Sequence, residues 1–82
     1  MNEVFLIGKI ISDIEFKFTI NSKNISIAMF NMKTTDKQII KIKAYNELAD
    51  YCYSKLEINK IVFIKGKFFD NSINIENIKI LN

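Results

Sequence analysis

Apolar and polar residues alternate along most of this chain, a pattern typical of β-strands that bury one face. Stretches rich in Asn, Asp, Ser and Lys interrupt the alternation at residues 21–24, 35–37 and 70–72, and their composition predicts turns. Residues 14–20 form either a strand of their own or the continuation of the first strand past a bend. The alternation predicts strands over residues 3–11, 14–20, 25–34, 38–45, 60–69 and 73–81.

The period changes between residues 46 and 56, where apolar side chains recur every three or four positions, as on one face of a helix. Asn46 is a favoured residue for the N-cap of this helix, and the acidic residues of the first turn suit the helix dipole. We expect the single cysteine of the chain to pack in the core. The predicted buried stripe is Leu48, Ala49, Cys52 and Leu56.

Five long strands with a helix between the third and the fourth follow the order of the OB-fold, an antiparallel Greek-key barrel. The two glycines, Gly8 and Gly66, lie inside predicted strands rather than in turns. Glycine within a strand marks a bulge, a barrel corner or a close approach of another backbone. Because 82 residues suffice for only one small core, we predict a single OB-fold domain over residues 1–82.

The amino-acid composition limits the classes of function that this chain can have. The net charge is +3, and all twelve basic residues are Lys, which allows contacts to phosphates but disfavours readout of base edges by bidentate Arg. The single Cys excludes an internal disulfide and a multi-cysteine metal site, and the absence of His removes the commonest general base and the commonest metal ligand. We find no nucleophile–base pair, phosphate loop or metal cluster. The sequence therefore predicts no enzyme, no metal and no cofactor.

Three segments resemble blocks of the bacterial single-stranded DNA-binding proteins, in the order and spacing of that family. Residues 2–18, NEVFLIGKIISDIEFKF, resemble its opening Asn–X–Val–X–Leu–(Ile/Val)–Gly block and the acidic–apolar–basic–aromatic run that follows. Residues 44–56, AYNELADYCYSKL, resemble its aromatic–Gly–Lys–Leu–Ala segment and helix, and residues 62–68, VFIKGKF, its fourth long strand. The resemblance covers about residues 2–81. It implies binding of single-stranded DNA without strong sequence preference, in DNA replication, repair and recombination.

The departures from that family are as informative as the resemblance. The chain has no Trp, and Ile39 stands where relatives keep a tryptophan on the third long strand. The family's aromatic residue at the end of that strand is retained as Tyr45. Two long hairpins are shortened to residues 35–37 and 70–72, and the sequence ends at Asn82 without the acidic C-terminal tip of many members. Fewer rings predict weaker stacking per subunit.

Alternation places cations and rings together on one side of two predicted strands. In residues 38–45, Lys41, Lys43 and Tyr45 lie opposite the apolar set; in residues 60–69 the corresponding set contains Phe63, Lys65, Lys67 and Phe69. Binders of single strands combine cations for the phosphates with rings that accept any base. Lys17, at the family's basic position, and Lys33 are further expected phosphate contacts. The predicted nucleic-acid-binding residues are Lys17, Lys33, Lys41, Lys43, Tyr45, Phe63, Lys65, Lys67 and Phe69.

Other interpretations stay open at this point. Any strand with one solvated face alternates, and Lys is common on such faces, while Phe63 could lie under a neighbouring subunit. A different function for this fold is a primosomal-type module that bridges replication proteins, and a third is a nucleic-acid enzyme subunit. Lysines and rings do not distinguish DNA from RNA, so RNA is also a candidate ligand.

The sequence also leads to expectations for the oligomeric state and the cellular location. Family members associate through the first strand, and here Phe5 and Ile7 leave an apolar side available for pairing, so we expect a homodimer or a tetramer. The N-terminus carries an acidic residue at position 3 and an apolar run broken at Gly8, which is neither a signal peptide nor a membrane span. We therefore expect a cytoplasmic, nucleoid-associated protein.

Overall fold

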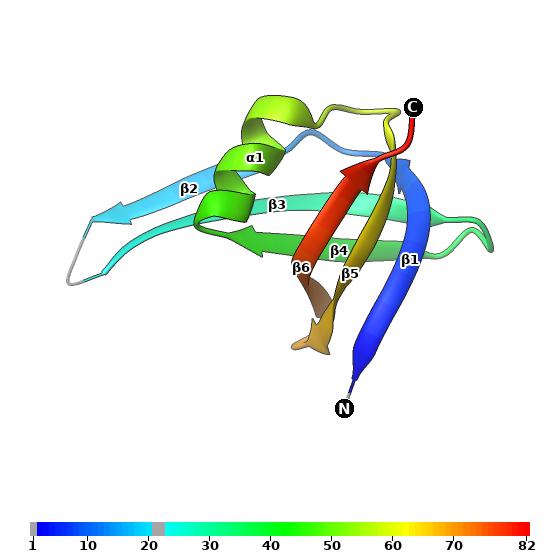
Figure 1. Ribbon diagram of the computed structural model, residues 1–82, viewed down its shortest axis with the longest axis horizontal. Coiled ribbons are helices and arrows are strands. Elements are labelled where there is room, and N and C mark those ends of the chain that lie inside the picture. The colour runs from blue at the N-terminus through cyan, green and yellow to red at the C-terminus, as the bar shows by residue number, and fades with distance from the viewer. Residues whose placement is uncertain (1, 21–22) are drawn as a thin grey trace.

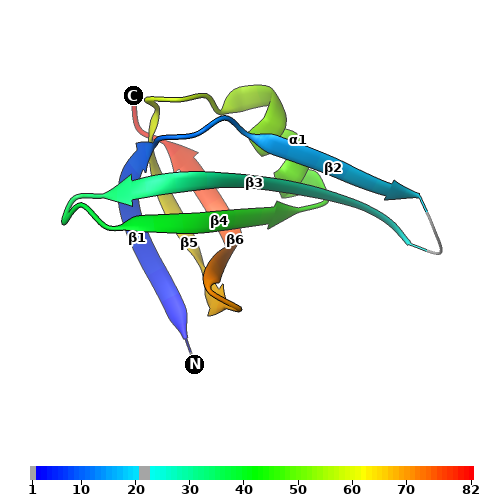
Figure 2. The same ribbon diagram turned by 180° about the vertical axis from the view of Figure 1, so that it is seen from behind.

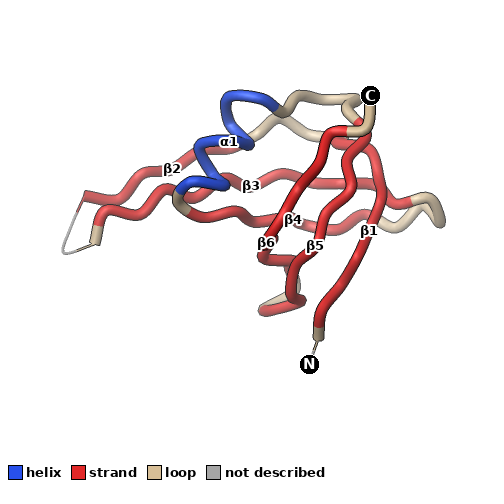
Figure 3. Tube along the Cα trace, viewed as in Figure 1, coloured by secondary structure: helices blue, strands red, loops and turns tan. Residues whose placement is uncertain are grey.

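The computed structural model describes residues 2–20 and 23–82, which form strands and one helix (Figures 1 and 3). The predicted turn at 21–24 therefore lies partly outside the described residues. Each predicted strand is present, with ends shifted by at most one residue. The elements are β1 (Glu3–Ile10), β2 (Glu15–Ile20), β3 (Asn24–Thr34), β4 (Ile39–Tyr45), α1 (Glu47–Lys55), β5 (Ile61–Phe69) and β6 (Ser72–Ile80).

The strands close into a barrel. Neighbours in the sheet follow the order β1-β5-β6-β4-β3-β2, and an additional pairing of β1 with β3 closes it. Among the described residues, all strand pairings are antiparallel except one: β4 pairs with β6 in parallel at Ile42↔Ile73 and Lys43↔Asn74. The barrel with its helix after the third long strand confirms the predicted OB-fold, while the parallel β4–β6 pairing departs from an all-antiparallel arrangement.

β1 and β2 behave as one long bent strand, because both pair with β3. The C-terminal end of β1 pairs with Met32–Thr34 and β2 pairs with Asn24–Met29, in the same direction. The bend between them stays tied to β3: the Ile11 amide donates to the Asn31 carbonyl at 3.0 Å, and the Asn31 amide donates to Ser12 Oγ at 2.7 Å. By its pairing, β2 therefore continues the first strand past a bend, which is the second of the two predicted alternatives. The strand is nevertheless interrupted between Ile10 and Glu15.

The core has the composition that alternation predicted. In β4, Ile42 and Ala44 are fully buried, and in β5 Val62 and Ile64 are, while their sequence neighbours face solvent. Phe68 departs from the pattern, being about half exposed near the end of the β5–β6 hairpin. The buried apolar residues are Ile10, Ala28, Phe30, Met32, Ile42, Ala44, Ala49, Cys52, Leu56, Val62, Ile64, Ile73, Ile75 and Ile78.

Helix α1 presents its predicted apolar stripe to the barrel, with Ala49 and Cys52 fully buried. Asn46 occupies the N-cap position as predicted, but its side chain makes no capping hydrogen bond. Asn46 instead adopts a positive φ of 56°, a conformation that Asn tolerates, and its amide donates to the Ser26 carbonyl at 2.8 Å. Tertiary pairing, rather than capping, fixes the start of the helix.

The β5–β6 hairpin turns over two residues, one fewer than expected. Asp70 and Asn71 both have positive φ, 53° and 63°, as in a type I′ turn, and Phe69 pairs with Ser72. The turn between β3 and β4 is closed by the Thr34 amide, which donates to the Gln38 carbonyl at 2.9 Å. No helix in residues 2–20 and 23–82 is long and apolar enough to cross a membrane.

Candidate nucleic-acid interface

The outward side of β2, β3 and β4 is a broad exposed sheet surface. Figure 2 shows these three strands side by side at the front of the molecule, with α1 and the other strands behind them. Strand alternation turns the odd-numbered residues of all three strands outward, opposite the buried set. We call this surface the β2–β3–β4 face; its residues are Glu15, Lys17, Ile27, Met29, Asn31, Lys33, Ile39, Lys41, Lys43 and Tyr45.

Strand register brings four predicted residues of this face into neighbouring rows. Lys17 pairs with Ile27, which pairs in turn with Tyr45, so that a cation and a ring flank one aliphatic side chain. The next rows hold Lys43 beside Met29 and Lys41 beside Asn31. Side chains opposite each other on neighbouring strands lie roughly 5 Å apart at Cβ, so the rows form one continuous surface. Lys17, Lys41, Lys43 and Tyr45 are thus brought together as predicted.

A hollow of about 410 Å³ opens on this face, lined by Lys41 and by Met29 and Asn31 of β3. Met29 offers a polarizable surface against which a flat ring can pack. The far rim carries Asp13 and Glu15, which disfavour a phosphate there. The arrangement therefore suits a base in the hollow and a backbone phosphate on the Lys41 side.

Tyr45 is the ring of this face. Tyr45 is 39% exposed, so part of its ring is accessible to a ligand. Ile39, at the position where relatives carry tryptophan, is 63% exposed and lies opposite Lys33. In the part of the chain that the structure describes, Lys41 and Lys43 form no ion pair, so their charges are available to an anion.

The predicted residues of β5 lie elsewhere on the barrel. β6 stands between β4 and β5, so Lys65 and Lys67 belong to a surface distinct from the β2–β3–β4 face (Figure 1). Both are also engaged: Lys65 Nζ lies 3.7 Å from Glu3 Oε2, and Lys67 Nζ lies 3.6 Å from Glu76 Oε2. Such half-exposed ion pairs contribute little stability, but they partly neutralise the two lysines. The two halves of the predicted site are therefore separated by β6, and Lys67 is aligned with Lys43 only through Asn74 of that strand.

Phe63 belongs to an apolar patch that continues onto β1. Its ring stacks on that of Phe5, with centroids 6.3 Å apart, and Lys65 Nζ lies 6.0 Å from the Phe5 centroid. Phe5 is 59% exposed and Ile7 is 47% exposed, so two large apolar side chains remain in contact with solvent. Phe69, the last predicted ring, lies at the far end of β5 beside the hairpin turn and is exposed.

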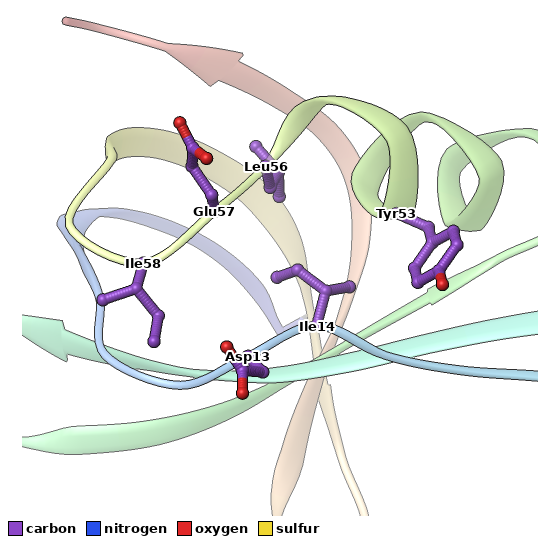
Figure 4. Close-up of a pocket in the computed structure, with 6 residues that line it drawn as sticks. All are labelled: Asp13, Ile14, Tyr53, Leu56, Glu57 and Ile58. Carbon is purple, nitrogen blue, oxygen red and sulfur yellow. The ribbon is translucent and has the colours of Figure 1, made fainter.

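A cavity of about 430 Å³ lies between the β1–β2 connection and the end of α1 (Figure 4). Two carboxylates, Asp13 and Glu57, line it, together with apolar side chains and Tyr53. The ring of Tyr53 packs on Phe16, with centroids 4.8 Å apart. Two carboxylates repel a phosphate, so this cavity is a poor place for a nucleic-acid backbone.

Three residues of β3 belong to the β2–β3–β4 face but were not among the predicted binding residues. Ile27, Met29 and Asn31 alternate with the buried Ala28 and Phe30, and this alternation was the signal that could have found them. Cys52 is buried as predicted, and burial raises the pKa of its thiol to about 12, so it is inert near neutral pH. Across the described residues, no group of three or more His, Cys, Asp or Glu side chains could hold a metal ion.

Solved structures share the fold of this chain, whereas no protein-family model and no curated protein matches its sequence. The single-stranded DNA-binding protein of Thermus aquaticus superposes with a TM-score of 0.89 at 14% identity, over 100% of this chain and 41% of its own. The SSB domain of a Synechococcus protein gives 0.85 at 12% identity, over 95% of this chain and 93% of its own. A deletion mutant of the Thermus protein superposes with a TM-score of 0.79 at 18% identity, over 100% of this chain and 51% of its own.

The two Thermus chains are thus about twice as long as this one or longer, whereas the Synechococcus domain matches it nearly end to end. At such identities the likeness shows the fold. The chain has the OB-fold of the bacterial single-stranded DNA-binding proteins.

Proposed function

We propose that this protein binds single-stranded DNA without strong sequence preference, as a non-enzymatic component of DNA replication, repair or recombination in the cytoplasm, at the nucleoid. The observation that carries this proposal is the β2–β3–β4 face. There Lys17, Lys41 and Lys43 alternate with Tyr45 and Met29 on an open surface. Cations that follow the phosphates, beside rings and soft apolar side chains that accept bases, are the requirements for binding a single strand of any sequence.

The salt dependence of binding tests the proposal. We expect a fluorescently labelled dT30 to bind at low salt, with log K falling against log[salt] at a slope of about −3 if about four lysines meet phosphates. Fluorescence-anisotropy titrations at 50 and 200 mM salt measure this slope, and a parallel titration with U30 measures the preference for DNA over RNA. A wild-type protein that leaves dT30 unbound at low salt would refute the proposal and favour the protein-bridging module instead.

We also propose that the protein associates with itself through β1. One edge of β1 pairs with β5 along Glu3–Lys9, but the other pairs with β3 only at Gly8–Ile10. Within the described residues, the edge at 3–7 is thus unpaired, and it lies beside the exposed Phe5 and Ile7. An unpaired edge next to apolar side chains favours pairing with a second copy. Association would also multiply contacts along one DNA strand.

A negative charge introduced at position 5 tests whether the protein associates with itself through β1. Phe5→Glu is expected to shift the protein to monomers in analytical ultracentrifugation, because it places a carboxylate in the apolar patch next to Glu3. Phe18→Glu is the matched control, since it makes the same change at a similarly exposed ring on β2, a strand that does not pair with β1. If both variants sediment like the wild type, β1 is not the interface.

A further inference from the structure

Two lysines face each other where β1 crosses β3. Lys9 and Lys33 are partners in the register of this pairing, between Gly8↔Thr34 and Ile10↔Met32, and both are exposed. Like charges directly opposite each other on neighbouring strands are destabilising. The register therefore places two like-charged side chains opposite each other, at a cost to the stability of the fold.

Gly8 is what allows this juxtaposition. A Cβ atom on Gly8 would lie 2.5 Å from the carbonyl oxygen of Lys33 and 2.9 Å from Met32 Cγ. Only glycine lets β1 approach the backbone of β3 this closely, and the next residue, Lys9, then faces outward beside Lys33. Gly8 thus permits the close approach of the two strands, and Lys9 and Lys33 supply the two charges.

Nothing in the described chain neutralises these two charges. The ion pairs among those residues are Lys65–Glu3 and Lys67–Glu76, and neither involves Lys9 or Lys33. The carboxylate of the adjacent turn, Asp36, accepts a hydrogen bond from the Thr34 hydroxyl. A pair of lysines without a carboxylate partner is suited to an anion that comes from outside the chain.

A cavity of about 240 Å³ adjoins the pair, with the aliphatic side chains of Ile7 and Ile61 on one side. This volume is below that of a site for a drug-sized ligand, so it suits one small group such as a single base or sugar. An anion site beside a small apolar cavity matches the two parts of one nucleotide. The cavity is lined by Ile7, Gly8, Lys9, Lys33, Thr34, Thr35 and Ile61.

The pair also continues the β2–β3–β4 face. Lys33 lies opposite Ile39 at the end of that face, two residues along β3 from Asn31, which lies opposite Lys41. A chain that passes over Lys43 and Lys41 therefore meets Lys33 next, and Lys9 lies beyond it on β1. The path from β4 across β3 to β1 thus carries four lysines, Lys43, Lys41, Lys33 and Lys9.

We infer that one backbone phosphate of the bound strand sits between Lys9 and Lys33, with an adjoining base or sugar against Ile7 and Ile61. This inference rests on the proposed binding of single-stranded DNA. It makes Lys9, which the sequence analysis did not single out, a phosphate contact.

The test compares Lys9→Gln, Lys33→Gln and the double variant with the wild type in dT30 titrations from 50 to 200 mM salt. Each phosphate contact that is lost lowers the magnitude of the log–log slope by about 0.7, so the double variant is expected to lose about 1.4. At ~0.1 M salt this corresponds to an affinity about 20-fold lower. Lys55→Gln on α1 is the control, and its slope should stay close to that of the wild type.

Thermal unfolding of the same variants separates binding from folding. Removing one member of a like-charged pair relieves repulsion, so the midpoint of Lys9→Gln should equal or exceed that of the wild type while its DNA affinity falls. If Lys41→Gln lowers the slope but Lys9→Gln and Lys33→Gln do not, the phosphate seat is refuted and the proposed function stands. If the wild type does not bind dT30, both fall.

Discussion

Replacing Lys41 by Glu together with Tyr45 by Ala is expected to weaken binding of dT30 by about 100-fold or more in 50 mM salt. Loss of a stacked base contributes about 1–3 kcal/mol, and loss of a phosphate contact lowers the salt slope by about 0.7. The new carboxylate adds repulsion beside the acidic rim that Asp13 and Glu15 already form. Fluorescence anisotropy measures the affinity, and thermal unfolding verifies that the variant is folded.

Helix α1 offers a matched control for this variant. Lys55→Glu with Tyr53→Ala makes the same chemical changes at exposed positions, on the side of the barrel away from the β2–β3–β4 face (Figure 2). We expect this control to bind dT30 within about threefold of the wild type, because neither side chain meets the proposed path and only the net charge changes. Equal losses in the two variants would mean that the β2–β3–β4 face has no special role, and attention would move to Lys65, Lys67 and Phe63 on β5.

The order of strands around the barrel explains why the predicted site divides into two. Lys43 and Lys67 are both linked to Asn74 by register, Lys43 through the parallel pairing and Lys67 through the antiparallel one. β6 therefore separates the two lysine-bearing strands, and the barrel curves between them. A strand of DNA that reached both sets would have to cross β6, where Asn74 lies between Lys43 and Lys67.

Alternation predicted which side each residue faces, because the period of two belongs to the strand itself and does not depend on its partners. Phe5 and Lys9 face outward, and Ile42 and Val62 inward, as that period requires. The fold class followed from the order of elements and from two glycines inside strands. These features are local, so a single sequence carries them.

Pairing between distant segments could not be predicted in the same way. The contacts of Lys65 with Glu3 and of Lys9 with Lys33 join residues far apart in the chain. The conformation of Asn46 depends on a hydrogen bond to Ser26, which propensity at a helix start does not contain. Which lysines are already paired with a carboxylate, and which can bind an external anion, therefore depends on the folded barrel.

Gly66→Ala is expected to lower the free energy of unfolding by about 3 kcal/mol or more, the range of a severe packing clash. The added Cβ would lie 2.4 Å from the carbonyl oxygen of Asn74 and 2.9 Å from the Cα of Ile75, both backbone atoms of β6. Neither can move without opening the β5–β6 pairing, whose register shifts beside Gly66. For a domain of this size, the midpoint of thermal unfolding should fall by roughly 12 °C or more.

Lys67→Ala is the control, one residue further along β5 at an exposed position. Its effect should stay within about 0.5 kcal/mol, because the ion pair that it removes is half exposed. Gly66 is not among the residues with positive φ, so Ala could adopt its backbone conformation and the cost comes from the space alone. A Gly66→Ala protein that melts within a few degrees of Lys67→Ala would therefore show that β6 can yield at this point. The close approach of the two strands would then not be what makes glycine necessary there.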